Sequence, residues 1–290
     1  MVCNCISMRR LGVHTSIAGG LSLSLERAHA LGCNTMQIFS HNPRGWTIKE
    51  IPEEESARFK TLRQRLDISP VYIHTSYLIN MASKDSILRK KSIAMLREEM
   101  DRADALGADF VILHTGSASG DDDRLSRQRA IAAVKYVAQM GVWQAGLLIE
   151  NTAGERGDIS SQITDLSEIL HGVHGSLISG ICFDTCHAFS AGYDMRDDQG
   201  IQMIVREIET HITMQKVKLI HLNDSKGERG SGIDRHEHIG LGKIGVAGLQ
   251  QLIHSRPFST VPVILETPKK QDSDDHRNLR MVRKMLRLKR

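Results

Sequence analysis

Histidine and acidic residues recur along this 290-residue chain at nearly regular intervals. From His74 the steps are 40 residues to His114, 36 to Glu150, 34 to Asp184 and 37 to His221. Each of these residues stands at the end of a short apolar run. Imidazole nitrogen and carboxylate oxygen are ligands that zinc and similar divalent ions accept at open catalytic sites. With four neighbours of the same types, the nine metal-capable residues are His74, His114, Glu150, Asp184, His187, His221, Asp234, His236 and Glu266.

A structural role is the alternative for each of these residues taken alone. A single histidine at the end of an apolar strand more often forms a hydrogen bond than binds a metal. Glu150 follows the apolar run GLLI, and a buried carboxylate is costly unless a cation or hydrogen bonds offset its charge. Packed together without cations, these carboxylates would repel one another. The group as a whole therefore predicts metal binding, and the spacing of Asp234 and His236 lets both side chains reach one ion.

The stretch CFDTCHAFSAGYD, which begins at Cys182, allows three interpretations: a cysteine zinc site, a redox pair, or a carboxylate–imidazole site beside cysteines. A four-sulfur zinc site needs a second cysteine pair. Cys3 and Cys5 are the remaining candidates, but a frayed N-terminus is a poor place for such a site. The chain has five cysteines and no CxxC, which indicates a reduced protein. We therefore expect Cys182 and Cys186 to pack nearby while Asp184 and His187 face the metal, although these two need not bind the same ion.

Eight short apolar runs, often β-branched, predict buried strands that alternate with helical patterns. Eight strand–helix units in about 250 residues match a closed (β/α)₈ TIM barrel of the α/β class. A doubly wound open sheet is the alternative, but the chain has no GxGxxG or Walker sequence. In a barrel, the metal-capable residues would converge at the carboxyl ends of the strands. The predicted strands are 11–17, 35–40, 71–77, 109–116, 146–152, 179–187, 217–224 and 262–268, and the predicted helices are 20–31, 53–66, 83–107, 122–140, 161–171, 198–212, 246–254 and 274–287.

The longest predicted helix, 83–107, has an apolar stripe at helical spacing and a glycine at its end. Ser83 and Ser86 are the candidate N-caps, and Gly107 is the stop signal.

Composition and charge set wider limits on the class of protein. The chain is 40% hydrophobic and 25% charged, with a net charge of +4, which is weak evidence for a polyanionic partner. No apolar run reaches the roughly eighteen residues of a membrane span, and no secretion signal is evident. We expect a cytoplasmic protein with a disordered lead over residues 1–10, or a start at Met8, and a single catalytic domain over 11–290. The basic end MVRKMLRLKR is either the last barrel helix or a phosphate-binding surface.

Seven stretches of the sequence together resemble the endonuclease IV family of zinc-dependent abasic-site endonucleases. The resemblance covers about residues 11–268 in the same order, and several of the motifs are long. These stretches are HTSYLIN (74–80), LHTGS (113–117), IENTAG (149–154), DTCHAFSAGYD (184–194), HLNDSKG (221–227), DRHEHIGLGKIG (234–245) and LETP (265–268).

The resemblance implies a xylose-isomerase-like barrel with three zinc ions per chain, acting as a monomer on double-stranded DNA that contains abasic sites. It implies hydrolysis 5′ to the abasic site by a hydroxide beside Glu150, leaving a 3′-hydroxyl and a 5′-deoxyribose phosphate. Arg44, Tyr77 and Leu78 would enter the DNA. By the same resemblance, His74 and His114 bind the first ion, Glu150 bridges it to the second, Asp184, His221 and Glu266 complete the second, and His187, Asp234 and His236 hold the third.

Two other functions stay open. A metal-dependent sugar isomerase or epimerase would share the barrel and its metal-binding mouth, but would need one or two ions. A catalytically silent DNA-binding protein is disfavoured because every matched ligand position is intact. One departure from the family is Leu241, where an acidic residue is often found, and this puts the contacts that support the ligands there in doubt.

Overall fold

A closed barrel of parallel strands forms the centre of the computed structural model, which describes residues 9–155, 157–173, 175 and 177–287. Hydrogen bonds order the eight strands of its sheet as β1-β10-β7-β6-β5-β4-β3-β2, and a parallel bridge between His14 and Gln37 joins the two ends. The ring confirms the predicted TIM barrel and excludes the open sheet. Its strands are β1 (Leu11–Val13), β2 (Met36–Phe39), β3 (Val71–His74), β4 (Phe110–Leu113), β5 (Gly146–Glu150), β6 (Ile178–Asp184), β7 (Val217–His221) and β10 (Val263–Leu265).

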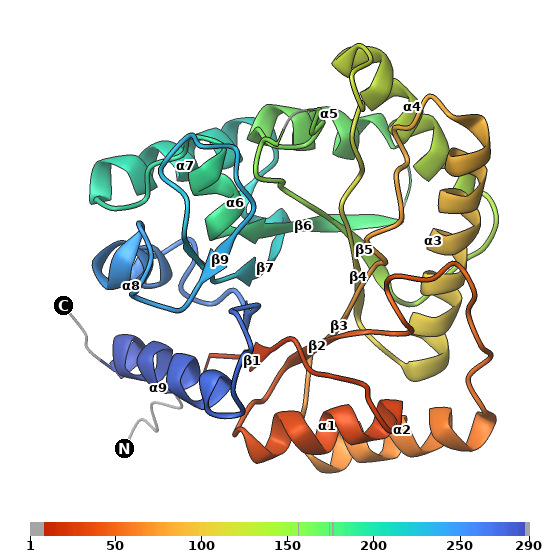
Figure 1. Cartoon of the computed structure of the whole chain (residues 1–290), viewed down its shortest axis with the longest axis horizontal. Helices are drawn as coiled ribbons and strands as arrows, with labels where there is room; N and C mark the ends of the chain where they lie inside the picture. Colours follow the sequence, from red (N-terminus) through yellow and green to blue (C-terminus); the bar gives the residue numbers. More distant parts are fainter. Residues whose placement is uncertain (1–8, 156, 174, 176, 288–290) are drawn as a thin grey trace, which may run out of the picture.

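Helices surround the strands on the outside of the ring (Figure 1). All eight predicted helices are present, but a short helix, a 3₁₀ turn and a two-strand hairpin were not predicted, because each is too short for its periodicity to appear. The helices are α1 (Leu21–Ala30), α2 (Glu53–Arg65), α3 (Ser86–Leu106), α4 (Asp123–Ala138), α5 (Ile163–Gly172), α6 (Thr185–Ser190), α7 (Asp198–His211), α8 (Gly245–His254) and α9 (Ser273–Arg287), with η1 (Met214–Lys216) and the hairpin β8 (Asp224–Ser225) and β9 (His236–Glu237).

The N-cap of α3 corrects the prediction. Asp85, and neither candidate serine, caps the helix: its carboxylate accepts hydrogen bonds from the backbone N–H groups of Ile87 and Leu88. Ser83 lies two residues earlier, and its Oγ accepts from the Asp85 N–H, which fixes the turn into the helix. The predicted stop is confirmed, because Gly107 has a left-handed φ of 65° that a residue with a side chain rarely adopts.

An apolar layer inside the barrel explains where the polar residues lie. Six fully buried side chains, one from each of six neighbouring strands, pack together in the interior. Side chains alternate between the two faces of a strand, so the next inward position lies two residues further on. That position is metal-capable on all six strands: Tyr72 precedes His74, Ile112 precedes His114, Leu148 precedes Glu150, Cys182 precedes Asp184, Leu219 precedes His221, and Ile264 precedes Glu266.

The two ends of the described chain are attached to the barrel. The Arg9 guanidinium donates to the carbonyl oxygens of Ile253, Phe258 and Val261. Most of the expected disordered lead, residues 1–8, lies outside the described residues. Residues 281–287 of the basic C-terminal stretch belong to α9, which buries Leu279 and other apolar side chains, as a final barrel helix does. Among the described residues, no helix combines the length and the apolar character that crossing a bilayer requires.

Candidate metal centre

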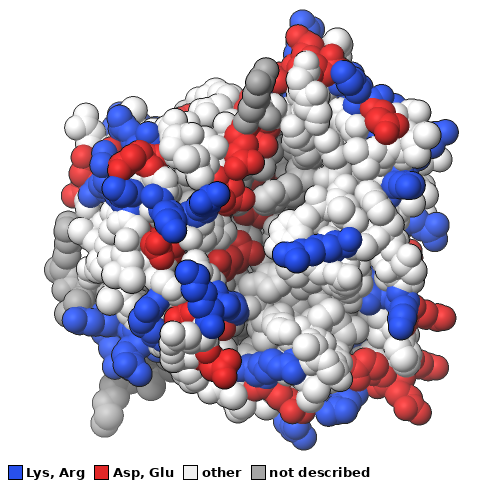
Figure 2. Space-filling model, in the orientation of Figure 1, with Lys and Arg blue, Asp and Glu red and all other residues white. Residues whose placement is uncertain are grey.

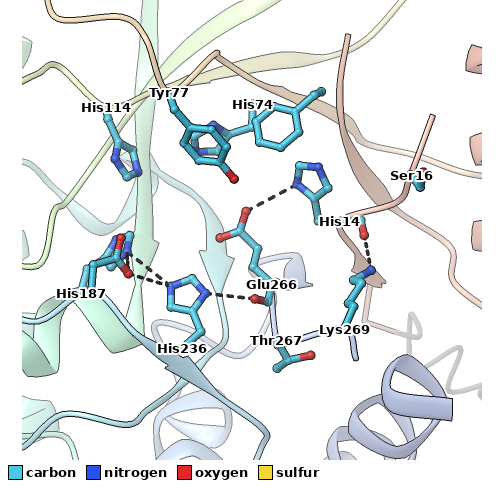
Figure 3. A pocket seen from close by; sticks show the side chains of 12 residues that line it. His14, Ser16, His74, Tyr77, His114, His187, His236, Glu266, Thr267 and Lys269 are labelled. Atoms are coloured by element: carbon cyan, nitrogen blue, oxygen red, sulfur yellow. Dashed lines mark hydrogen bonds and ion pairs between the residues drawn. The ribbon is translucent and has the colours of Figure 1, made fainter. Parts of the chain in front are cut away.

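The fold brings the nine metal-capable residues together at the carboxyl end of the barrel. Most of them line one cavity of about 490 Å³, and His74, His114, His187, His236 and Glu266 point into it (Figure 3). Their possible ligand atoms fall into groups whose members lie within 4.8 Å of one another. Three of these groups are His74, His114 and Glu150; Glu150, Asp184, His221 and Glu266; and His187, Asp234 and His236.

Glu150 lies at the centre of the cluster and is fully buried. Its Oε2 atom is 3.2 Å from Nε2 of His74 and 3.2 Å from Nε2 of His114. Its Oε1 atom faces the other side, 2.9 Å from Nδ1 of His221. A carboxylate with one oxygen toward each group has the geometry to join two ions.

The second group is held together by a buried asparagine. Asn223 donates from Nδ2 to Oδ2 of Asp184 at 2.7 Å, and its Oδ1 accepts from the backbone N–H of Glu266 at 2.8 Å. Within the group, Nδ1 of His221 lies 3.2 Å from Oε2 of Glu266 and 3.8 Å from Oδ2 of Asp184. Asn223 therefore links the Asp184 carboxylate to the backbone of Glu266, and His221 lies between their carboxylates.

The third group gives the clearest test of whether a cation fits. His187 lies 2.9 Å from the Asn151 carbonyl through Nδ1, and His236 lies 3.0 Å from the Glu266 carbonyl through Nδ1. A carbonyl only accepts, so each Nδ1 carries a proton, and Nε2 is the atom through which each ring can offer a lone pair to a cation. The two Nε2 atoms are 3.4 Å apart, and Oδ1 of Asp234 lies 3.1 Å and 3.5 Å from them. Three electron-pair donors facing one another fit a bound cation.

The pKa shifts of His187 and Glu150, at the mouth of the barrel, also favour a bound cation. Burial lowers the pKa of His187, but the charges of Asp184 and Asp234 outweigh it and raise that pKa well above its usual value. Burial raises the pKa of Glu150, yet His221 and His114 bring it well below the usual range. Clustered carboxylates therefore favour positive charge here, and divalent ions supply it more compactly than protonated imidazoles. The Nε2 atom of His114 is buried and, although Oε2 of Glu150 lies 3.2 Å away, it has no partner in hydrogen-bond geometry, which suits a metal ligand.

Two supporting residues were missed in the sequence. Gln37 donates from Nε2 to Oε1 of Glu266 at 2.5 Å, and its Oε1 lies 2.7 Å from Nε2 of His221, so it orients two residues of the second group. His14 lies 3.6 Å from Oε1 of Glu266. The stretch VHTS at 13–16 is similar to IHTS and LHTG around His74 and His114, and this signal could have identified His14. A glutamine inside a strand carries no such signal.

Cys182 and Cys186 lie beside the centre, and the Sγ atom of each is within 4.8 Å of possible ligand atoms of the cluster. Cys182 belongs to the apolar layer of the barrel interior, and Cys186 is buried in α6. Burial raises the pKa of each thiol to about 12, so both are protonated at neutral pH. Asp184 and His187 also present their side chains to the cluster, and their selection as ligands in place of the cysteines stays a prediction.

The three residues expected to contact DNA lie on two adjoining loops at the rim. Tyr77 is 67% exposed, lines the cavity and contacts the ring of Phe39 edge-on. Arg44 is exposed and Leu78 is half-buried. Ser76 joins the two loops by donating from Oγ to the Pro43 carbonyl at 2.7 Å. Figure 2 shows the hollow of this face with acidic side chains inside it and lysine and arginine side chains around it.

A buried network fixes the loop that carries Arg44. Glu99 on α3 is fully buried and accepts from Oγ of Ser40 at 2.6 Å, and its other oxygen lies 2.8 Å from Nε2 of His41. Arg102, one turn further along α3, donates to Oγ of Ser40 at 2.8 Å. The beginning of the loop is thereby attached to a long helix.

Comparison with known proteins agrees with this fold. Residues 25–289 match the family model described as a xylose isomerase-like TIM barrel. A D-tagatose 3-epimerase-like protein shares the fold, with a TM-score of 0.70 at 20% identity over 96% of this chain and 97% of that one. The chain is thus a xylose isomerase-like barrel protein.

More similar proteins define the family. A protein of Methanoculleus marisnigri named "probable endonuclease 4" is 39% identical over 276 residues, which are 95% of this chain and 98% of that protein. One of Halothermothrix orenii with the same name is 41% identical over 262 residues, 90% of this chain and 94% of that protein. The crystal structure of endonuclease IV from Thermus thermophilus superimposes with a TM-score of 0.84 at 33% identity, over 96% of this chain and 99% of that one. The chain belongs to the endonuclease IV family, which confirms the resemblance found in the sequence.

Proposed function

We propose that this protein is a DNA-repair hydrolase that cleaves the phosphodiester bond 5′ to an abasic site in duplex DNA. The products would be a 3′-hydroxyl and a 5′-deoxyribose phosphate. The observation that carries the proposal is the arrangement of nine metal-capable side chains in three adjoining groups, in a chain similar throughout its length to proteins named endonuclease 4.

The donor set of imidazoles and carboxylates fits three zinc ions. His74, His114 and Glu150 would hold the first ion, His187, Asp234 and His236 the third, and the remaining residues with Glu150 the second. Bound zinc supplies Lewis acidity toward phosphate oxygens and lowers the pKa of water toward about 7.

The side chains around the three ions would hold and orient the metal ligands. Glu150 presents one oxygen to each of two groups and keeps them at a constant separation. Buried partners such as Asn223 and Gln37 orient the ligands, so that little reorganisation is needed when the phosphate arrives. The apolar layer below the cluster closes the barrel interior, and the phosphodiester therefore enters from the open rim.

A sugar isomerase or epimerase of the same barrel class is the second candidate. The epimerase-like neighbour is only 20% identical, and this likeness extends to the fold alone. The feature that favours the nuclease is the third group, in which His187, Asp234 and His236 add a separate binding position to the groups around Glu150. An isomerase of one or two ions has no need of it.

Recognition of the abasic nucleotide would rest on the rim loops. A nucleotide without a base has no pairing or stacking to lose, so its extrusion from the duplex costs less than that of a normal nucleotide. Tyr77 and Leu78 would fill the space left in the stack, and Arg44 would contact the backbone.

Tyr77→Ala is expected to weaken binding to a duplex with a tetrahydrofuran abasic analogue by about tenfold, because stacking of a base on an aromatic ring contributes roughly 1–3 kcal/mol. Fluorescence anisotropy at constant salt measures this. Tyr136→Ala is the matched control, since Tyr136 is also exposed but lies on α4, outside the residues that line the cavity. Equal affinities for wild type and Tyr77→Ala would contradict the role of Tyr77.

The direct test of the function is incision by the wild-type protein. A labelled duplex with one tetrahydrofuran residue should be cut on its 5′ side, and the new end should be extended by a DNA polymerase, which requires a 3′-hydroxyl. An undamaged duplex of the same sequence should stay intact. A metal-replete protein that leaves the modified duplex uncut but epimerises ketoses would favour the second candidate.

A further inference from the structure

Asp224 is not one of the nine metal-capable residues, but its carboxylate organises the loop 236–245, which begins at His236 of the third metal group. Asp224 is fully buried and accepts hydrogen bonds from five backbone N–H groups. Oδ1 accepts three of these hydrogen bonds, and Oδ2 accepts the other two. The donors are Ser225 (2.9 Å), Ile244 (3.0 Å) and Gly245 (3.2 Å) to Oδ1, and Gly240 (2.9 Å) and Gly242 (3.0 Å) to Oδ2.

This loop begins at a residue of the third metal group. Asp224 and Ser225 form β8, which pairs antiparallel with β9, where His236 lies opposite Ser225. The chain then continues from β9 into the segment 240–245 that surrounds the Asp224 carboxylate. On its other side, Asn278 of α9 accepts from the backbone N–H of Ile239 at 3.1 Å. The backbone after His236 is therefore held from two sides.

The glycines of the segment show how closely the loop fits this carboxylate. Gly240 and Gly245 have positive φ values of 83° and 76°, which turn their N–H groups inward. A Cβ atom at Gly242 would lie 2.5 Å from Oδ1 of Asp224. Leu241, the departure noted in the sequence, is 67% exposed. The support of this loop thus comes from backbone N–H groups and the Asp224 carboxylate, so a leucine at 241 leaves it intact.

We propose that Asp224 is a positioning residue, which sets the backbone of the loop so that His236 meets His187 and Asp234 in the geometry of the third metal site. Asparagine at 224 would have one accepting oxygen and an NH₂ group. That NH₂ would face either the N–H groups of Gly240 and Gly242 or those of Ile244 and Gly245, and the donors would repel. The loop would then lose its hydrogen bonds to one side of residue 224, and His236 would no longer be held in position.

The test uses the metal-loaded protein and needs no DNA. Asp224→Asn is expected to retain about one zinc ion fewer per chain than wild type after gel filtration. At the least, it should release its most labile ion to a chromophoric chelator about 10- to 100-fold faster, the size of effect typical of residues that support metal ligands. Atomic emission measures the first quantity and stopped-flow absorbance the second.

Asp104→Asn is the matched control. The Asp104 carboxylate also accepts from backbone N–H groups, those of Gln144 and Ala145, but these precede β5 at the opposite end of the barrel. This variant should keep the zinc content and release rate of wild type even if its melting temperature falls. Equal zinc loss in both variants would assign the effect to general destabilisation and would overturn the proposal.

Gly242→Ala provides a second route if Asp224→Asn does not fold. It keeps the carboxylate but places a methyl group against the Ser225 carbonyl oxygen and 2.5 Å from Oδ1 of Asp224, so it disturbs the same contact between loop and β8 and should accelerate release of the same ion. Wild-type zinc content and release rates in both variants would overturn the role of Asp224. The inference rests on the metal binding in the proposed function, and the two fail differently: wild-type protein that binds no zinc removes both, whereas unchanged variants of a zinc-binding protein remove only the role of Asp224.

Discussion

Glu150→Gln is expected to lower incision of a tetrahydrofuran-containing duplex by more than about a hundredfold while the protein stays folded. Even residues that only support metal ligands typically contribute 10- to 100-fold to metal affinity or activity, and Glu150 would itself hold two ions. Its carboxylate faces Nε2 of His74 and His114 on one side and Nδ1 of His221 on the other. A neutral amide of the same size would fill the space but supply neither the charge nor the second electron-pair donor.

The fold should tolerate this change because it is isosteric. Glutamine fits the same fully buried position and keeps one accepting oxygen, so circular dichroism should match that of wild type. Glu168→Gln is the control: this carboxylate lies on α5, is paired with Arg127 and does not line the cavity. It should cut the duplex at the wild-type rate. Normal incision by Glu150→Gln would remove Glu150 from its proposed bridging role.

Removal of metal is expected to abolish incision and to lower the melting temperature by roughly 10 °C or more. Each ion that binds only the folded state contributes about 4 kcal/mol at a thousandfold excess over its Kd. Without ions, the clustered carboxylates lose the compensating charge of the metal, although the Nε2 atoms of His187 and His236 stay 3.4 Å apart. Exhaustive chelation followed by calorimetry and the incision assay measures both effects, and added zinc should restore them.

Metal content separates the two candidate functions. Native, fully active protein should contain close to three zinc ions per chain by atomic emission, one for each group. A single ion in a fully active sample would favour the isomerase. Full incision activity after chelation would contradict a metal-dependent reaction altogether.

Much of this site can be predicted from the spacing of residues along the chain. The period of two along a strand determines that His74 points to the same side as Tyr72, and Glu150 to the same side as Leu148. The interval of one strand–helix unit returns the chain to the same end of the barrel. Short-range patterns of this kind are present in consecutive residues, which is why the strands, the longer helices and the metal-capable residues could be predicted.

Other features have no local pattern. The capping of α3 depends on which of several neighbouring polar residues reaches the free N–H groups, and the sequence signals of Ser83, Ser86 and Asp85 are nearly equal. The six-residue α6 spans less than two turns, too few for a helical period to distinguish it from the end of a strand.

The order of strands, helices and polar residues along the chain is enough to predict the barrel and the nine metal-capable side chains at its mouth. Their supports become visible only in the folded barrel: Gln37 orients Glu266 from 229 positions away, and Asp224 accepts hydrogen bonds from backbone N–H groups up to 21 positions further on. This difference arises because periodicity is a property of neighbouring residues. A hydrogen-bond partner is chosen by packing, which brings distant segments to within about 3 Å only after the ring has closed.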